Sequence, residues 1–180
     1  MRAILFMVLA GLLSIPARAD DLTRRVGAGF NGGFDYALGS KYLTEHSDPA
    51  GIWGFWAKTG VNKRLAVGFS YDHLSFEHSD VRFQPQLINA FYQLRPESRW
   101  NPNVHAGIGY AFVSDVESGH KAAFSANAGL GADFLANSVV SFGITADYFL
   151  AARNSHTSHD LHVLVAALKL GFWSPPRPTH

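Results

Sequence analysis

Apolar and polar side chains alternate along most of the chain from about residue 24 onward. In the first such segment, 25–36, large apolar residues take every second position, and glycine and polar residues lie between them. Because successive side chains of a strand point to opposite faces, this period of two predicts β-strands with one apolar face and one small, polar face. Eight segments carry the pattern: 25–36, 52–61, 64–72, 82–94, 104–112, 122–134, 139–150 and 162–172.

Two of the eight segments are less regular than the others. Segment 52–61 fits the pattern best with Trp56 and Lys58 on the polar face, and segment 82–94 fits best with Phe91 there. We therefore expect two large aromatic side chains on a face that is otherwise made of small and polar residues.

The connections between the segments alternate in length. Short turns are predicted at 61–63, 95–101 and 136–138, and longer polar loops at 37–51, 73–81, 113–121 and 151–161. Short turns at one end and long loops at the other are typical of an outer-membrane barrel. Segments of about ten residues are long enough for a tilted crossing of a bilayer.

The two faces decide between a membrane barrel and a soluble one. A soluble eight-stranded barrel of the lipocalin kind would bury its apolar face, but the face rich in Gly, Ser, Asn and Asp has too little apolar volume for a dry core. Aromatic residues such as Tyr36, Trp53, Tyr110, Phe134 and Phe172 fall near the strand ends on the apolar face, as in interfacial girdles. The predicted fold is all-β, an eight-stranded antiparallel up-and-down transmembrane β-barrel with lipid outside.

Composition changes this interpretation little. Of 180 residues 47% are hydrophobic and only 16% charged, against about 25% charged in average soluble domains. The absence of cysteine excludes a disulfide scaffold and a thiolate metal site, and a net charge of +1 gives no basic footprint for nucleic acid. The spacing of 27–32 matches G-x-G-x-x-G, but it lies inside a strand segment with no following helix, so no cofactor is predicted.

The first nineteen residues differ from the rest of the chain. A positively charged start precedes the apolar run 3–13, and Ala17-Arg18-Ala19 has the small-x-small pattern of a cleavage site. This is the pattern of a secretory signal peptide, too short for a transmembrane helix. The predicted organisation is a signal peptide at 1–19, a barrel at 20–173 and a short periplasmic tail at 174–180.

Charged residues on the small, polar face are the first candidate site. They are balanced, with four of each sign: Arg25, Lys58, Arg64, Lys169, Asp35, Asp72, Asp133 and Asp147. An eight-stranded barrel encloses a space that side chains alone can fill, and buried charges need partners. We expect an ion-pair and hydrogen-bond network in the lumen; a narrow ion path or a buried catalytic carboxylate are the alternatives.

Histidines in the long loops are the second candidate site. The sequence Glu-His-Ser-Asp occurs at both 45–48 and 77–80, in the first two long loops, and two further histidines lie in the fourth. Neutral imidazole is a common ligand of divalent transition metals. The hypothesis is a metal site at the loop rim, against the alternative of solvated loops, with these candidate ligands: His46, Asp48, His78, Asp80, His156 and His159.

Short glycine-containing motifs occur in five of the segments. They are Val26-Gly-Ala-Gly-Phe30, Gly68-Phe-Ser-Tyr-Asp-His-Leu-Ser75, His105-Ala-Gly-Ile-Gly-Tyr110, Gly129-Leu-Gly-Ala-Asp133 and Leu168-Lys-Leu-Gly-Phe172. With the leader, they make the chain resemble the OmpA-like family of small outer-membrane β-barrels. The resemblance implies that Leu168, Leu170 and Phe172 form the signal read by the barrel-assembly machinery, although 173–180 extends past it.

The function we predict is that of a porin-like, Gram-negative outer-membrane protein without enzymatic activity. Its structural or surface-interaction role would lie in four extracellular loops, with lipid, lipopolysaccharide, an extracellular ligand or a divalent metal as partners. The rivals are a narrow ion channel and a lipid A-modifying enzyme, because the later strands superficially resemble lipid A deacylase barrels. That family has a His and a Ser two residues apart where this chain has Asp147 and Phe149, so the activated nucleophile is missing.

Overall fold

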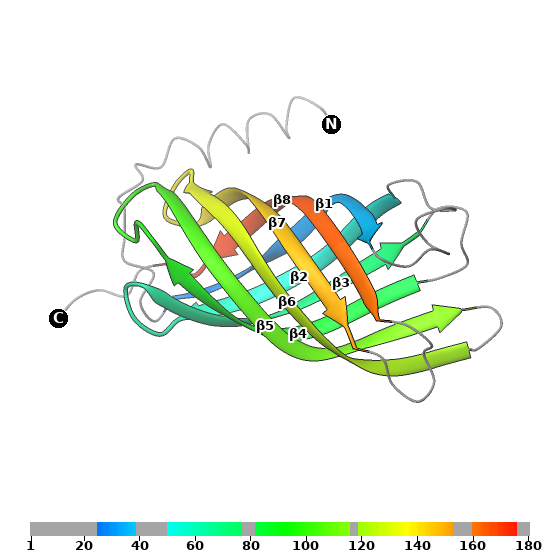
Figure 1. Cartoon of the computed structure of the whole chain (residues 1–180). Helices are drawn as coiled ribbons and strands as arrows, with labels where there is room; N and C mark the ends of the chain where they lie inside the picture. Colours follow the sequence, from blue (N-terminus) through cyan, green and yellow to red (C-terminus); the bar gives the residue numbers. More distant parts are fainter. Residues whose placement is uncertain (1–24, 39–49, 77–81, 116–118, 153–159, 176–180) are drawn as a thin grey trace, which may run out of the picture.

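The computed structural model describes residues 25–38, 50–76, 82–115, 119–152 and 160–175. They form eight strands: β1 (Val26–Leu38), β2 (Ala50–Gly60), β3 (Leu65–Ser75), β4 (Arg82–Gln93), β5 (Trp100–Asp115), β6 (Gly119–Leu135), β7 (Val140–Ala151) and β8 (Leu161–Trp173). Each strand pairs antiparallel with the next, and β1 also pairs with β8, which closes the barrel (Figure 1). The predicted fold class is confirmed. Within the described ranges, no helix is long and apolar enough to span a bilayer.

The two ends of the barrel differ in their connections. Tight turns join β2 to β3, β4 to β5 and β6 to β7 at one end, called the turn end here; the opposite end is called the loop end. The predicted long loop 113–121 is wrong in most of its length, because β5 and β6 continue as a paired hairpin until Asp115 faces Gly119. Strands of 16 and 17 residues result. Polar residues on both faces hide this extension in the sequence.

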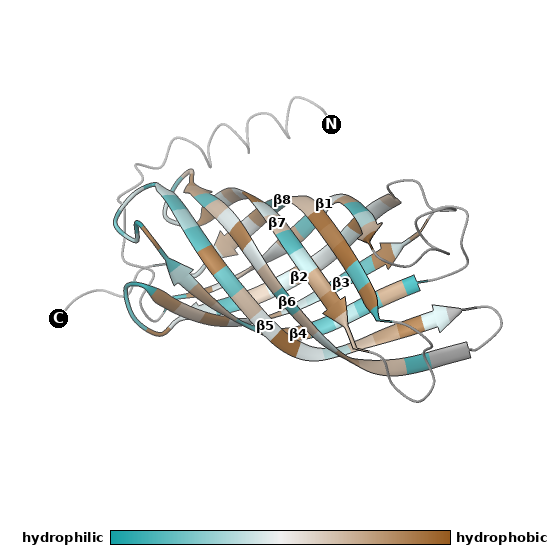
Figure 2. Ribbon diagram, in the orientation of Figure 1, coloured by the Kyte–Doolittle hydropathy of each residue, from teal (hydrophilic) through white to brown (hydrophobic). Residues whose placement is uncertain are grey.

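Along the middle of the wall the outward face is apolar around the barrel, as the alternation predicts. Large side chains such as Phe34, Ile88 and Leu168 are about two-thirds exposed, at 68%, 69% and 69%. Figure 2 shows brown and teal residues alternating along the strands. In water, so much exposed apolar surface would be strongly unfavourable, whereas lipid chains cover it without cost. The predicted inward positions of Trp56 and Phe91 are also confirmed, since both side chains are buried.

The loop-side half of the lumen is apolar, which corrects one expectation from the sequence. Phe83 and Phe149 meet edge to face there, with ring centroids 6.2 Å apart, and Leu74, Leu87 and Val163 are fully buried around them. The sequence suggested too little inward apolar volume for such a core, because several of these residues lie in or next to the predicted loops. We call this cluster the loop-side core; its members are Ala37, Ile52, Leu74, Phe76, Phe83, Leu87, Ala111, Ala123, Phe149, Ala151, Leu161, Val163, Val165 and Ala167.

Candidate functional site: the polar layer of the lumen

Below the loop-side core, toward the turn end, polar and charged side chains fill the lumen. They come from all eight strands, and most of them are buried. We call this set the polar layer; it consists of Asn31, Lys58, Ser70, Asp72, Asn89, Asn103, His105, Asn127, Asp133, Thr145, Asp147 and Lys169.

On its side toward the turn end, the polar layer contains a buried ion pair. The Nζ atom of Lys58 lies 2.9 Å from Oδ2 of Asp133, and both side chains are less than a tenth exposed. The same ammonium group lies 4.9, 5.0 and 5.2 Å from the ring centroids of Trp56, Phe91 and Trp173. A desolvated cation is attracted to aromatic faces at this range. The two inward aromatics that interrupted the alternation therefore have a role, which is to surround this lysine.

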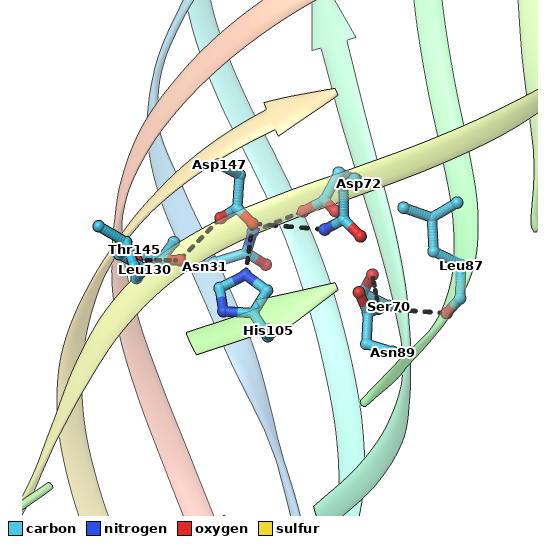
Figure 3. Close-up of polar contacts among 10 residues, drawn as sticks. Asn31, Ser70, Asp72, Leu87, Asn89, His105, Leu130, Thr145 and Asp147 are labelled. Atoms are coloured by element: carbon cyan, nitrogen blue, oxygen red, sulfur yellow. Dashed lines mark hydrogen bonds and ion pairs between the residues drawn. The ribbon is translucent and has the colours of Figure 1, made fainter. Parts of the chain in front are cut away.

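Asp147 is the centre of a second cluster in the layer (Figure 3). Its Oδ1 atom lies 2.5 Å from Nε2 of His105 and accepts a hydrogen bond from Asn127 at 3.3 Å, and its Oδ2 atom accepts one from the Thr145 hydroxyl at 2.7 Å. A buried carboxylate needs such donors to offset its loss of water. The Thr145 hydroxyl thus donates to the Asp147 carboxylate and not to the His105 imidazole. An activated nucleophile requires a hydroxyl that donates to its base, so this arrangement does not provide one.

Two further pairs continue the layer toward the opposite wall (Figure 3). Asn31 donates to Oδ1 of Asp72 at 2.6 Å, and Asn89 donates to the Ser70 hydroxyl at 2.9 Å. Each pair joins side chains from different strands, so the contacts tie the wall together across its interior. The layer therefore acts as a set of cross-links.

Glycines of the intervening strands make room for these cross-links. Gly54 of β2 lies between Asn31 of β1 and Asp72 of β3 in the strand register. A Cβ atom at Gly54 would lie 2.4 Å from the Asp72 carboxylate and 2.7 Å from the Asn31 amide oxygen, which are impossible contacts. The same arrangement recurs at Gly107 and Gly129. The glycine-rich face thus lets polar side chains from every second strand meet.

Most of the eight predicted lumen charges are buried inside the barrel. Lys169 lies in the polar layer, 5.8 Å from the Phe91 ring centroid, together with the pairs described above. Arg25 is buried at the turn end, where its Nε atom donates to the Ser174 carbonyl oxygen at 2.8 Å. Asp35 is buried next to the loop-side core and accepts a hydrogen bond from the Ala50 amide at 3.2 Å, so it does not join the layer.

Arg64 is not in the lumen, and this corrects the predicted set. Its side chain is exposed, and NH1 donates to the Tyr92 hydroxyl on the outside of the barrel at 3.1 Å. The physical reason is its position: Arg64 precedes the first residue of β3, where the wall no longer encloses a side chain. Alternation alone assigns a face, but it does not show where the wall ends.

His105 is a titratable residue of the polar layer that the predicted network of charges did not include, nor did that network include the layer's uncharged amide and hydroxyl side chains. With Arg64 outside, three basic side chains remain in the lumen against four aspartates, and His105 pairs with one of these. A signal was present in the sequence, because His105 lies on the same face as Gly107 and Gly109 of its strand. Finding its partner required the register that places it across Gly129 from Asp147.

The candidate metal ligands His46, Asp48, His78, Asp80, His156 and His159 lie outside the described residues. Within the described ranges, no three His, Asp or Glu side chains are grouped closely enough to hold a metal ion. The predicted signal peptide also lies outside these ranges. Leu168, Leu170 and Phe172 are described, and all three face outward from β8. Their reading as an assembly signal stays a prediction.

A family model described as an outer membrane protein beta-barrel domain matches residues 5–172 of the chain. No curated protein matches the chain by sequence.

Solved structures of small outer-membrane barrels are similar to this one. The N-terminal β-barrel domain of OprF from Pseudomonas aeruginosa is 16% identical with a TM-score of 0.59, and the match covers 84% of this chain and 98% of that one. Neisserial surface protein A is 13% identical with a TM-score of 0.60, covering 84% and 96%. OprG from Pseudomonas aeruginosa is 11% identical with a TM-score of 0.55, covering 88% and 99%. At these identities the likeness shows a shared fold.

Proposed function

Since the chain belongs to the outer membrane protein β-barrel family, we propose that it is a closed barrel without enzymatic activity. Its role would be structural or would lie in interactions of the surface that it presents at its loop end. Outer-membrane barrels place their longer loops outside the cell and their short turns in the periplasm. The rim of the loop end and the outward face next to it are then the parts that extracellular partners and lipopolysaccharide contact.

The filled lumen is the observation that carries this proposal. The loop-side core closes one half of the barrel with fully buried side chains such as Leu74, Phe83 and Leu87. The polar layer closes the middle, and the cavity among its side chains measures about 40 Å³. That volume holds one or two water molecules, far from a continuous aqueous path. A closed lumen favours a surface role over a diffusion channel.

The polar layer gives little support to the rival enzyme. His105 and Asp147 resemble part of a catalytic triad, but the hydroxyl near them donates to the carboxylate. Both side chains are also buried inside the barrel, whereas the acyl chains of lipid A lie outside the wall. In the stretch that resembles the deacylases, Asp147 and Phe149 face the lumen and Tyr148 faces outward. The two positions that correspond to the deacylase His and Ser therefore point away from the lipid.

Two measurements separate the three functions. In planar bilayers, we expect the refolded protein to give no conductance steps, and truncation of the loop-side core in Leu87→Ala to leave this unchanged, because the polar layer still closes the lumen. Conductance that appears in the variant would identify the core as the gate of a channel. In cells with and without the protein, we expect identical lipid A acylation by mass spectrometry; a lost acyl chain would establish the enzyme.

The loop histidines remain a separate, sequence-based proposal. If His46, His78 and the neighbouring carboxylates bind a divalent metal, calorimetric titration of the refolded barrel with zinc gives saturable binding that the His46→Ala, His78→Ala variant loses. Binding no stronger than background removes this proposal and leaves the closed barrel unaffected.

A further inference from the structure

One sector of the outward face carries a run of polar residues at the loop end. On β4, Arg82, Gln84 and Gln86 occupy three successive outward positions at the loop end. Next to them on β3, His73 and Ser75 also face outward. We call these five residues the rim patch.

Over β1 and β8 the outward face stays apolar up to Tyr36 and Leu164, and His162 is the first polar outward residue of β8 beyond them. The outward residues of β1 and β8 include Phe34, Tyr36 and Leu164, all exposed. The apolar band therefore ends lower on the wall over β3 and β4 than over β1 and β8. Because polar side chains are unfavourable in hydrocarbon, this sector must face the headgroup region of the outer leaflet.

The rim patch is organised by specific contacts. The Gln84 side-chain nitrogen lies 3.0 Å from Nδ1 of His73, and the His73 ring stacks on Trp53 with centroids 5.2 Å apart. Directly below, Phe55 stacks on Tyr71 at 5.1 Å. An ordered polar group thus lies directly above a continuous surface of aromatic rings.

Arg82 gives the patch its charge. It is exposed at the start of β4, and its strand partners on either side are Ser75 of β3 and Ser114 of β5. A guanidinium group flanked by hydroxyl and amide groups matches a phosphate, which accepts paired hydrogen bonds from arginine. The aromatic rings below match acyl chains. Both features together fit a phosphorylated lipid, with its headgroup at the patch and its chains along β2 and β3.

We propose that the rim patch binds the phosphorylated disaccharide of lipid A in the outer leaflet. Arg82 holds a phosphate, the amide groups of Gln84 and Gln86 bind headgroup oxygens, and Trp53 and Tyr71 contact the acyl chains. The proposal rests on the outer-membrane placement of the barrel with its loop end outward. It does not depend on the lumen being closed.

The test compares lipids that differ only in phosphate. The full-length protein, refolded in detergent, is titrated with diphosphoryl lipid A and with the same lipid after dephosphorylation, and bound lipid is counted by native mass spectrometry. We expect diphosphoryl lipid A to bind about ten- to a hundredfold more tightly, the effect of one charge-assisted contact. Inorganic phosphate should not compete at millimolar concentration, because it lacks the acyl chains.

Three variants locate the site. Arg82→Gln should lose the preference for the phosphorylated lipid, and the double variant Gln84→Leu, Gln86→Leu should bind both lipids more weakly. Arg95→Gln changes another exposed arginine, at the turn end, and should retain this preference. All four substitutions lie on exposed or outward positions, and heat-shifted migration on gels verifies that each variant folds. An equal affinity for both lipids in the wild type, or a preference that Arg82→Gln retains, would overturn the proposal, whatever the conductance measurements give.

Discussion

The two halves of the lumen fill the same tube in different ways. The loop-side core does it with large apolar side chains, of which Phe83, Leu87 and Val163 have no exposed surface. The polar layer does it with charged and amide side chains that need one another, as Lys58 needs Asp133. Interiors are close-packed in both cases, but dispersion forces are not directional and hydrogen bonds are.

This difference determines how much each half depends on exact geometry. In the loop-side core a lost methylene group leaves a cavity, and its neighbours relax in part. In the polar layer a lost partner leaves a buried charge or donor without compensation. We therefore expect the polar layer to tolerate paired changes and to reject single ones, and the core to lose stability in proportion to the volume removed.

The largest effect is expected from breaking the buried ion pair. Lys58→Met leaves Asp133 buried without its closest cation, and the free energy of unfolding should fall by about 3–5 kcal/mol. The measurement is urea unfolding of the barrel in lipid vesicles, followed by tryptophan fluorescence. The double variant Lys58→Met, Asp133→Asn removes both charges and should recover a large part of the loss. Additive losses would show that the two groups act independently, contrary to the 2.9 Å contact.

A smaller loss is expected in the loop-side core. Leu87→Ala removes a fully buried side chain next to the contact between Phe83 and Phe149, and should cost about 2–4 kcal/mol in unfolding free energy. Ile88→Ala is the matched control, because the neighbouring side chain is 69% exposed toward lipid. Its loss should be clearly smaller in the same vesicles. Equal losses would mean that the loop-side core contributes no more than the lipid-facing surface.

The sequence predicted the polar layer better than the loop-side core for a physical reason. Strand periodicity assigns a face to each residue, and this sufficed to place Lys58, Asp133 and Asp147 inside. Phe83 and Phe149 also lie on the inward face, but each stands near a strand end where the alternation is not readable: Phe83 lies between the outward Arg82 and Gln84, and Phe149 lies between two further large side chains, Tyr148 and Leu150. The register was not readable either, because it depends on pairing between strands. His105 and Asp147 become partners only through it.

The glycines of the inward face distinguish the two halves further, because they leave the space that the polar layer occupies. A Cβ atom at Gly107 would lie 2.2 Å from the Asn89 amide oxygen and 2.6 Å from that of Asn127, so Gly107→Ala must displace both side chains. Overpacking of this kind should cost about 1–3 kcal/mol in the same unfolding measurement. Gly51→Ala is the control, since no atom lies within 4 Å of its added methyl group, and its stability should stay within about 0.5 kcal/mol of the wild type. Similar losses in Gly107→Ala and Gly51→Ala would show that the cost comes from a change in strand propensity and not from overpacking.

The smallest effect is expected from the ion pair outside the lumen. Lys63 and Glu97 lie 3.4 Å apart at the turn end, with side chains 63% and 77% exposed. Water screens this pair and holding two long side chains costs entropy, so Glu97→Gln should change the unfolding free energy by less than about 1 kcal/mol. Moderate salt should keep this difference between Glu97→Gln and the wild type small, because dissolved ions screen exposed charges. Removing one partner of the pair between Lys58 and Asp133, which lie 2.9 Å apart inside the barrel, is expected to cost several times more unfolding free energy. The charge that is left behind there has little water to replace its lost partner. A loss at Glu97 as large as that of Lys58→Met would show that proximity, rather than burial, decides what a charge pair contributes in this barrel.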